Sequence, residues 1–110
     1  DENPGTVRAV VGALNKGTKD TIAAPQQALE VLKARDPMVK LDIEKVRLDL
    51  ALSLTNTPWV QKNGLSVVQP ERLKLTIDAV ATAYGIQQPP KPEDVYVDTF
   101  LPPLPERQVN

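Results

Sequence analysis

The sequence contains no cysteine and no histidine. These absences exclude zinc sites built from Cys and His, cysteine nucleophiles and Ser-His-Asp triads. Aromatic residues make up only 4% of the chain, so any core must consist mainly of Leu, Val, Ile and Ala side chains. Apolar runs are only a few residues long, far short of the ~20 residues that cross a bilayer as a helix.

The chain also lacks an excess of basic residues. Its 110 residues include 13 Lys and Arg against 14 Asp and Glu, which gives a net charge of −1. A protein that binds DNA or RNA needs a positive face to neutralise phosphates. We therefore predict no nucleic-acid partner.

No sequence motif for catalysis or metal binding is present. There is no Gly-rich phosphate loop, no HExxH motif and no EF-hand pattern. The carboxylates, Glu30 and Asp78 among them, fall at helix caps or on predicted polar faces, and a solvated surface carboxylate is a poor general acid. We therefore predict that the chain is not an enzyme and that it holds no metal or cofactor.

Prolines and helix caps divide residues 1–85 into five predicted helices. A proline at the first helical position lacks an N–H that would have no partner there, and Asn or Thr just before it can cap the helix. Gly85 suits the left-handed residue that follows a helix. The predicted helices are Pro4–Ala23 capped by Asn3, Pro25–Arg35, Ile43–Leu54 capped by Asp42, Pro58–Asn63 capped by Thr57, and Pro70–Tyr84.

Three of these helices carry apolar residues at helical spacing. In Pro4–Ala23 we interpret Gly12, beside the apolar face, as tolerated rather than as a point of close approach. In Ile43–Leu54 the apolar residues cover more than one face, so this helix needs cover on two sides. The apolar face of Pro4–Ala23 consists of Val7, Val10, Val11, Leu14, Thr18 and Ile22, and Arg8, Asn15, Lys16, Lys19 and Asp20 face away from it. The apolar residues of Ile43–Leu54 are Ile43, Val46, Leu48, Leu50, Ala51, Leu52 and Leu54. The apolar face of Pro70–Tyr84 consists of Leu73, Ile77, Val80, Ala81 and Tyr84.

The composition changes after residue 85. Six of the eleven prolines lie between Pro89 and Pro105, which is typical of a Pro-rich tail. The tail also contains too many apolar side chains for a solvated linker, so we expect it to lie along a folded surface. We predict a helical turn near Pro92–Tyr96 and disorder only in the last few residues. The predicted fold is thus an all-α chain of four to five helices (residues 1–85) with a Pro-rich C-terminal tail (residues 86–110).

Large aromatic and aliphatic side chains outside the main stripes are the candidate interface residues. Trp59 stands in the first turn of a short helix, where it is core, a stacking platform or part of an interface. Tyr96, Phe100 and Leu101 are the corresponding residues of the tail. Core packing is the favoured role of Trp59, Tyr96 and Phe100, and these four residues are our candidates for an interface with a missing lobe or with a second copy of the chain.

Several short segments, taken in order, resemble one protein family. They are Asn3-Pro4 with Val7-Arg8-Ala9, Ala24-Pro25-Gln26-Gln27-Ala28, Arg35-Asp36-Pro37, Gly64-Leu65, Pro70-Glu71-Arg72 leading into Thr76-Ile77-Asp78, and the tail Asp94–Pro102. This order resembles the C-terminal region of ABC-transporter solute-binding proteins of the nitrate/sulfonate/taurine and thiamine-pyrimidine-precursor type. Members of that family often carry Asp where this chain has Gln69.

The resemblance implies a two-lobe α/β periplasmic binding protein that closes over a small solute and delivers it to an ABC permease. Such a protein binds its ligand between the lobes, through loops and helix N-termini. This chain would then be its helical C-terminal portion, with the ligand-binding residues outside it. The implied location is the periplasm, or the cell exterior with a lipid anchor. The sequence begins at Asp1 with neither Met nor a signal peptide. We therefore expect that the chain has been cut or processed from a longer one.

A second hypothesis is an autonomous α-helical module that binds another protein through a groove or through its Pro-rich tail. Under the first hypothesis, the faces that met the missing lobe would drive self-association of the isolated chain, because large apolar patches rarely stay exposed. The solute itself is left open among nitrate, taurine, other sulfonates and pyrimidines.

Overall fold

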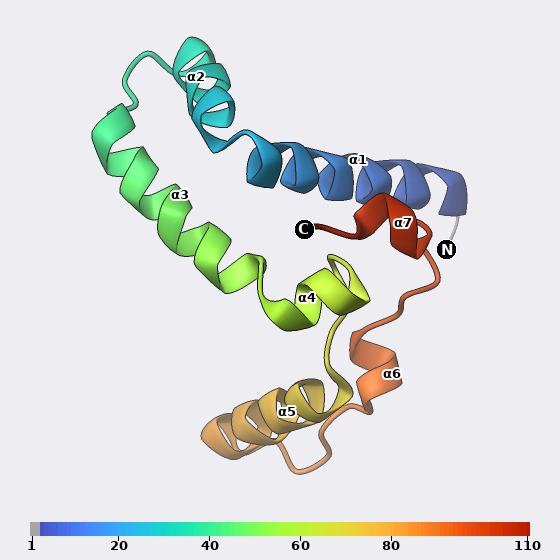
Figure 1. Cartoon of the computed structure of the whole chain (residues 1–110). Coiled ribbons are helices and arrows are strands. Elements are labelled where there is room, and N and C mark those ends of the chain that lie inside the picture. The colour runs from blue at the N-terminus through green and yellow to red at the C-terminus, as the bar shows by residue number, and fades with distance from the viewer. Residues whose placement is uncertain (1–2) are drawn as a thin grey trace. The chain divides into compact units, whose positions relative to one another are not determined.

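The computed structural model describes residues 3–110, and within this range the protein is all-α, as predicted. Figure 1 shows helices joined by short connections and no strand in the described part of the chain. The helices are α1 (Pro4–Ala23), α2 (Pro25–Arg35), α3 (Leu41–Thr55), α4 (Pro58–Asn63), α5 (Pro70–Tyr84), α6 (Pro92–Val95) and α7 (Leu104–Arg107).

The helix boundaries follow the proline and glycine signals. α1, α2, α4 and α5 begin and end at the predicted residues, each with proline in the first turn. The hydroxyl of Thr57 caps α4 by accepting a hydrogen bond from the Val60 amide, at 3.3 Å. Gly85 ends α5 in the left-handed conformation, at φ 65°. These local signals therefore predicted four helices correctly at both ends.

Two predicted caps were wrong. Asn3 precedes α1 but makes no side-chain cap, and Asp42 does not cap the third helix. α3 begins at Leu41, so Lys40 is the capping residue and its carbonyl accepts from the Glu44 amide at 3.0 Å. Asp42 lies inside the first turn, where its negative charge faces the positive end of the helix dipole instead of capping an amide. The error at Asp42 arose because Asp is favoured both at the capping position and in the first turn of a helix.

Contacts divide the chain into two compact units. The first contains residues up to 66 together with 101–110, and it holds α1 to α4 and α7. The second contains residues 67–100 and holds α5 and α6. The Pro-rich tail thus contributes to both units, since residues 86–100 belong to the second and 101–110 to the first.

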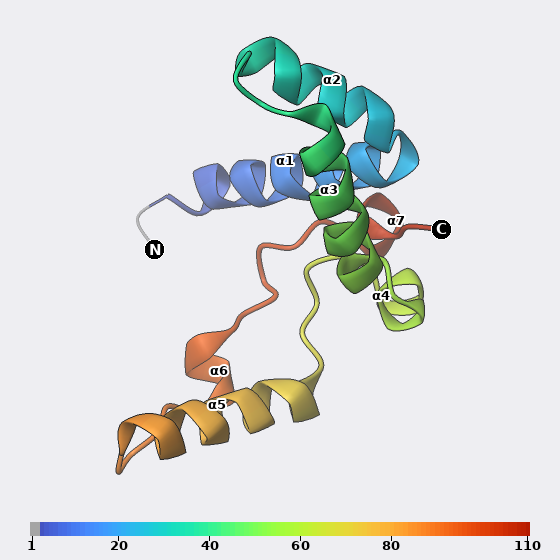
Figure 2. The ribbon, with the colours of Figure 1, turned by 90° about the vertical axis from the view of Figure 1, so that its left-hand side faces the viewer.

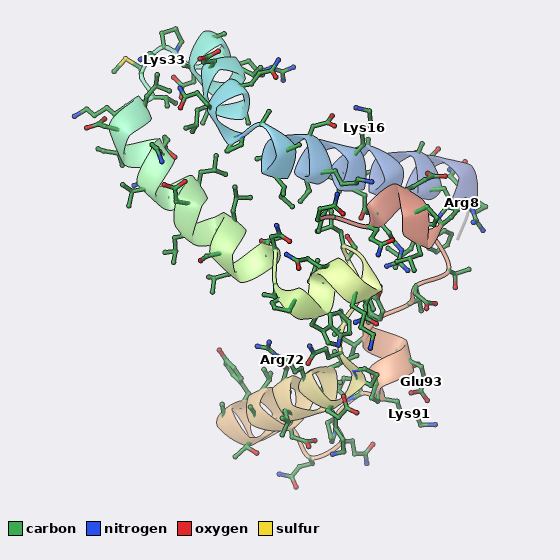
Figure 3. All side chains as sticks on the ribbon, viewed as in Figure 1. Arg8, Lys16, Lys33, Arg72, Lys91 and Glu93 are labelled. Atoms are coloured by element: carbon green, nitrogen blue, oxygen red, sulfur yellow. The ribbon has the colours of Figure 1, made fainter. Side chains whose placement is uncertain are left out.

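Within the first unit, α1 packs with α2, α2 packs with α3, and α7 lies beside α1 (Figures 1 and 2). Lys33, labelled in Figure 3, closes the connection between α2 and α3 by donating to the carbonyls of Pro37 and Val39, at 2.7 and 2.6 Å. Among the described residues only Leu29, Leu65 and Val109 are buried apolar side chains. The core of this unit is therefore small.

The C-terminal segment (residues 101–110) docks on the turn that follows α4. The Arg107 guanidinium donates to the carbonyls of Pro102, Asn63 and Leu65, at 3.0, 2.8 and 3.3 Å. The Leu65 amide donates to the Arg107 carbonyl at 2.8 Å. The disorder predicted for the last few residues was wrong: residues 104–107 are helical and Val109 is only 6% exposed. The reason is this network, whose partners are some forty residues away in sequence.

Asn15 corrects the predicted orientation of α1. It was placed on the polar face, yet it is the most buried residue of the helix, at 2% exposure. Its amide group donates to the Val11 carbonyl at 2.9 Å, and its oxygen accepts from the Ser66 hydroxyl at 3.2 Å. Ser66 itself has φ 65°, a left-handed conformation that is uncommon for a residue other than glycine. Val11 and Ile22 are half-buried as predicted, whereas Val10 and Leu14 are exposed.

In the second unit α5 packs with the short helix α6, which forms where a helical turn was predicted. Leu73, Ile77 and Ala81 form the half-buried side of α5, while Val80 and Tyr84, which the pattern assigns to the same face, are exposed. Across residues 3–110, no helix combines the length and the hydropathy that spanning a membrane requires.

Candidate interaction surface

Acidic side chains do not converge on a metal site in the part of the chain that the structure describes. No group of three or more potential metal ligands occurs there. The four ion pairs among these residues all join neighbours on one helix surface, such as Lys45 with Asp49 at 2.7 Å. Exposed pairs of this kind contribute little to stability. Large apolar side chains, by contrast, are exposed on several helices.

The four predicted interface residues are all half-buried. Trp59 lies in the first turn of α4, and Leu101 starts the segment that returns to the first unit. Tyr96 follows α6, and Phe100 is the last residue of the second unit. The more exposed apolar side chains lie elsewhere, on the long helices.

Among residues 3–110, the longest run of exposed large apolar side chains at helical spacing lies on α3. Ile43, Val46, Leu50 and Leu54 are spaced three, four and four residues apart and are 43%, 69%, 62% and 73% exposed. We refer to these four residues as the α3 stripe. At about 3.6 residues per turn they lie on roughly the opposite side of the helix from the half-buried Leu48 and Leu52. The over-apolar pattern had predicted that α3 needs cover on two sides, and within this chain one of those sides stays exposed.

Charged residues flank the α3 stripe on both sides. Asp42 stands on one side, is exposed, and has no ion-pair partner among residues 3–110. Arg47 stands on the other side, where it contacts Glu44 at 2.6 Å but leaves 70% of its side chain exposed. An apolar stripe with opposite charges on its two flanks is the usual layout of a helix that packs against another helix.

A second apolar feature is a groove within the second unit. It has a volume of about 240 Å³ and an almost wholly apolar lining. The groove is smaller than the roughly 300–1,000 Å³ of typical small-molecule pockets. Its lining residues come from α5, from the connection after it and from α6: Leu73, Thr76, Ile77, Val80, Ala81, Ile86, Pro90 and Val95.

Two residues important to the fold were missed by reasoning from the sequence. Arg107 stands in a predicted disordered end, and Asn15 stands on a predicted polar face, yet both make the contacts that hold the turn after α4. The glycine of Asn63-Gly64 was a signal for that turn, but nothing local indicates which distant side chain fills the space beside it.

Comparisons with protein-family models, with curated proteins and with solved structures gave no match.

Proposed function

We propose that this chain is the C-terminal helical part of the solute-binding component of an ABC importer, and that its role is to complete and stabilise one lobe. On this proposal the solute is an anionic or heteroaromatic small molecule, and residues outside this 110-residue chain bind it. The chain's own contribution is structural, since its apolar faces pack on the rest of the lobe.

The observation that carries this proposal is how little apolar surface the chain buries. Its accessible surface is 8350 Å². Two separate compact bodies of the sizes of the two units would expose about 7,000 Å² in total. Large apolar side chains are exposed along α1, α3 and α5, whereas only three are buried among the described residues. Such a balance is typical of a chain that is covered by further protein.

The order of sequence segments that resembles the solute-binding family is the second line of support. It covers almost the whole chain, from Asn3-Pro4 to the tail Asp94–Pro102. Gln69, where the family often has Asp, makes no side-chain cap on α5. The missing cap makes the start of α5 less stable, but it does not change which apolar side chains are exposed.

The first experiment is to determine the reading frame upstream of Asp1. A signal peptide followed by alternating strand and helix patterns is the expected result. A start codon directly before Asp1 would overturn the proposal and favour the autonomous interaction module. The longer product, once expressed, should show a rise in melting temperature with one of nitrate, taurine, other sulfonates or pyrimidines, because a ligand that binds only the folded state stabilises it.

A labelling experiment tests the structural role directly. Leu54→Cys introduces a single thiol on the α3 stripe of a chain without cysteine. At a concentration low enough to keep the 110-residue chain monomeric, its reaction with a thiol reagent should be fast in that chain and at least tenfold slower in the longer product. Lys45→Cys, on the other side of α3, is the matched control and should react fast in both. Equal labelling of Leu54→Cys in both proteins would mean that the rest of the protein does not cover α3.

A further inference from the structure

We propose that two copies of the isolated 110-residue chain associate through the α3 stripe, with their α3 helices parallel and in register. This inference concerns the chain by itself and does not depend on the proposed function. In a longer protein other residues could cover the same stripe, whereas in the isolated chain the available cover is a second copy.

The first argument is the position of the stripe. Val46, Leu50 and Leu54 are each more than 60% exposed, and they lie away from the side of α3 that faces α2. Association through them would leave the packing of the first unit unchanged. Ile43, Val46 and Leu50 also follow the alternating spacing of three and four residues that lets two helices interlock their side chains.

The second argument is the charge on the flanks, which selects the orientation. In two parallel helices in register, a residue on one flank meets the residue five positions later on the opposite flank of the partner helix. Asp42 and Arg47 are five residues apart and stand on opposite flanks. A parallel pair would therefore form two symmetric Asp42–Arg47 ion pairs. In an antiparallel pair, by contrast, each flank of α3 meets the same flank of the partner helix. Arg47 would then face Arg47, and the flank that carries Asp42 would face itself.

The third argument is the small size of the surface, which sets the strength of association. Four side chains from each copy cover less than the roughly 800 Å² per partner of a standard stable interface. We therefore expect a weak dimer that dissociates on dilution, with a dissociation constant on the order of 10–100 µM.

Sedimentation velocity and light scattering over about 1 µM to 1 mM chain test the association, with helix content followed by circular dichroism. The expected result is a shift from monomer to dimer. Leu50→Glu should abolish it, because it places a charge in the middle of the stripe. Leu75→Glu is the matched control, since Leu75 is 67% exposed on α5 in the other unit, and it should leave the dimer unchanged. A monomer throughout the range, or equal effects of the two variants, would overturn the proposal.

Two further measurements test the orientation. Asp42→Arg and Arg47→Asp should each raise the dissociation constant about tenfold, and the double variant should restore it, because only that variant re-forms opposite charges across the pair. Ser53 lies where a parallel helix meets its own copy, so Ser53→Cys should form an intermolecular disulfide on mild oxidation. Lys45→Cys, on the far side of the helix, should not. An absence of charge rescue, or equal cross-linking at the two positions, would contradict a parallel pair.

Discussion

Gly64 is the position where one methyl group should disturb the first unit most. It ends α4 at φ 87° and ψ 162°, a backbone conformation that residues other than glycine rarely adopt. A Cβ atom built there would lie 2.6 Å from Nη1 of Arg107 and 3.0 Å from Cδ1 of Leu104. Gly64→Ala must therefore both strain the backbone and push Arg107 away from the carbonyls that it binds.

The expected cost of Gly64→Ala is the sum of two effects. A residue with a side chain in a sparsely populated backbone region costs about 1–3 kcal/mol. Displacing Nη1 weakens its hydrogen bonds to Asn63 and Leu65, and a bond from a charged donor contributes about 1.5–3 kcal/mol when well shielded and less in this part-buried site. We expect a loss of about 2–4 kcal/mol, or roughly 10 °C or more in the melting temperature of a unit of this size.

A double-mutant cycle with Arg107→Ala separates the two effects. When Arg107 has been truncated, the new methyl group no longer competes with the guanidinium, so Gly64→Ala should cost only its backbone strain. The coupling energy between the two positions should be about 1–2 kcal/mol. Urea unfolding followed by fluorescence is the assay, because Trp59, the only tryptophan, lies in the same unit as Gly64. All variants are compared at one low chain concentration, so that association does not contribute to the measured stability.

Gly85→Ala is the matched control. Gly85 also has a positive φ, of 65°, but a Cβ there would meet nothing within 4 Å. Unfolding of this variant is followed by circular dichroism, because Gly85 lies in the second unit and Trp59 in the first. The substitution should cost roughly 1–2 kcal/mol of backbone strain and show no coupling to Arg107→Ala. The explanation would be refuted if Gly64→Ala and Arg107→Ala were additive to within about 0.5 kcal/mol.

Four further substitutions can be measured by the same urea unfolding, with circular dichroism used for Gln69→Asp because Gln69 lies in the second unit and Trp59 in the first. Gly12→Ala should stabilise the chain by up to ~1 kcal/mol, because Gly12 is helical and a Cβ there would meet no other atom within 4 Å; a loss of stability would point to a close approach instead. Thr57→Ala should lower the free energy of unfolding by about 1 kcal/mol, because α4 loses its side-chain cap. Gln69→Asp should raise it by roughly 0.5–1 kcal/mol, because Asp can cap α5, which has no side-chain cap. No change in either variant would mean that side-chain caps do not stabilise these helices. Val109→Ala should cost about 1–2 kcal/mol, as expected for a buried valine, and a neutral result would mean that the last residues do not pack.

The candidate surface could be predicted in part. The apolar residues of Ile43–Leu54 outnumber those that one helix face can hold, so a need for cover on two sides follows from the period of the helix alone. Which side is exposed does not follow, because it depends on where α2 packs. The predicted interface residues Trp59, Tyr96, Phe100 and Leu101 are half-buried, and their part in an interface stays a prediction.

The sequence by itself determined the fold class and most helix boundaries. Proline without an N–H, glycine at positive φ and Thr57 as a cap act within a few residues of their position, so the chain carries this information locally. Other features depend instead on groups that are some forty to fifty residues apart in sequence: the formation of α7, the burial of Asn15 beside Ser66, and the hydrogen bond from Arg107 to Asn63. Only the tertiary structure decides these, since a side chain is buried by the elements that surround it in space.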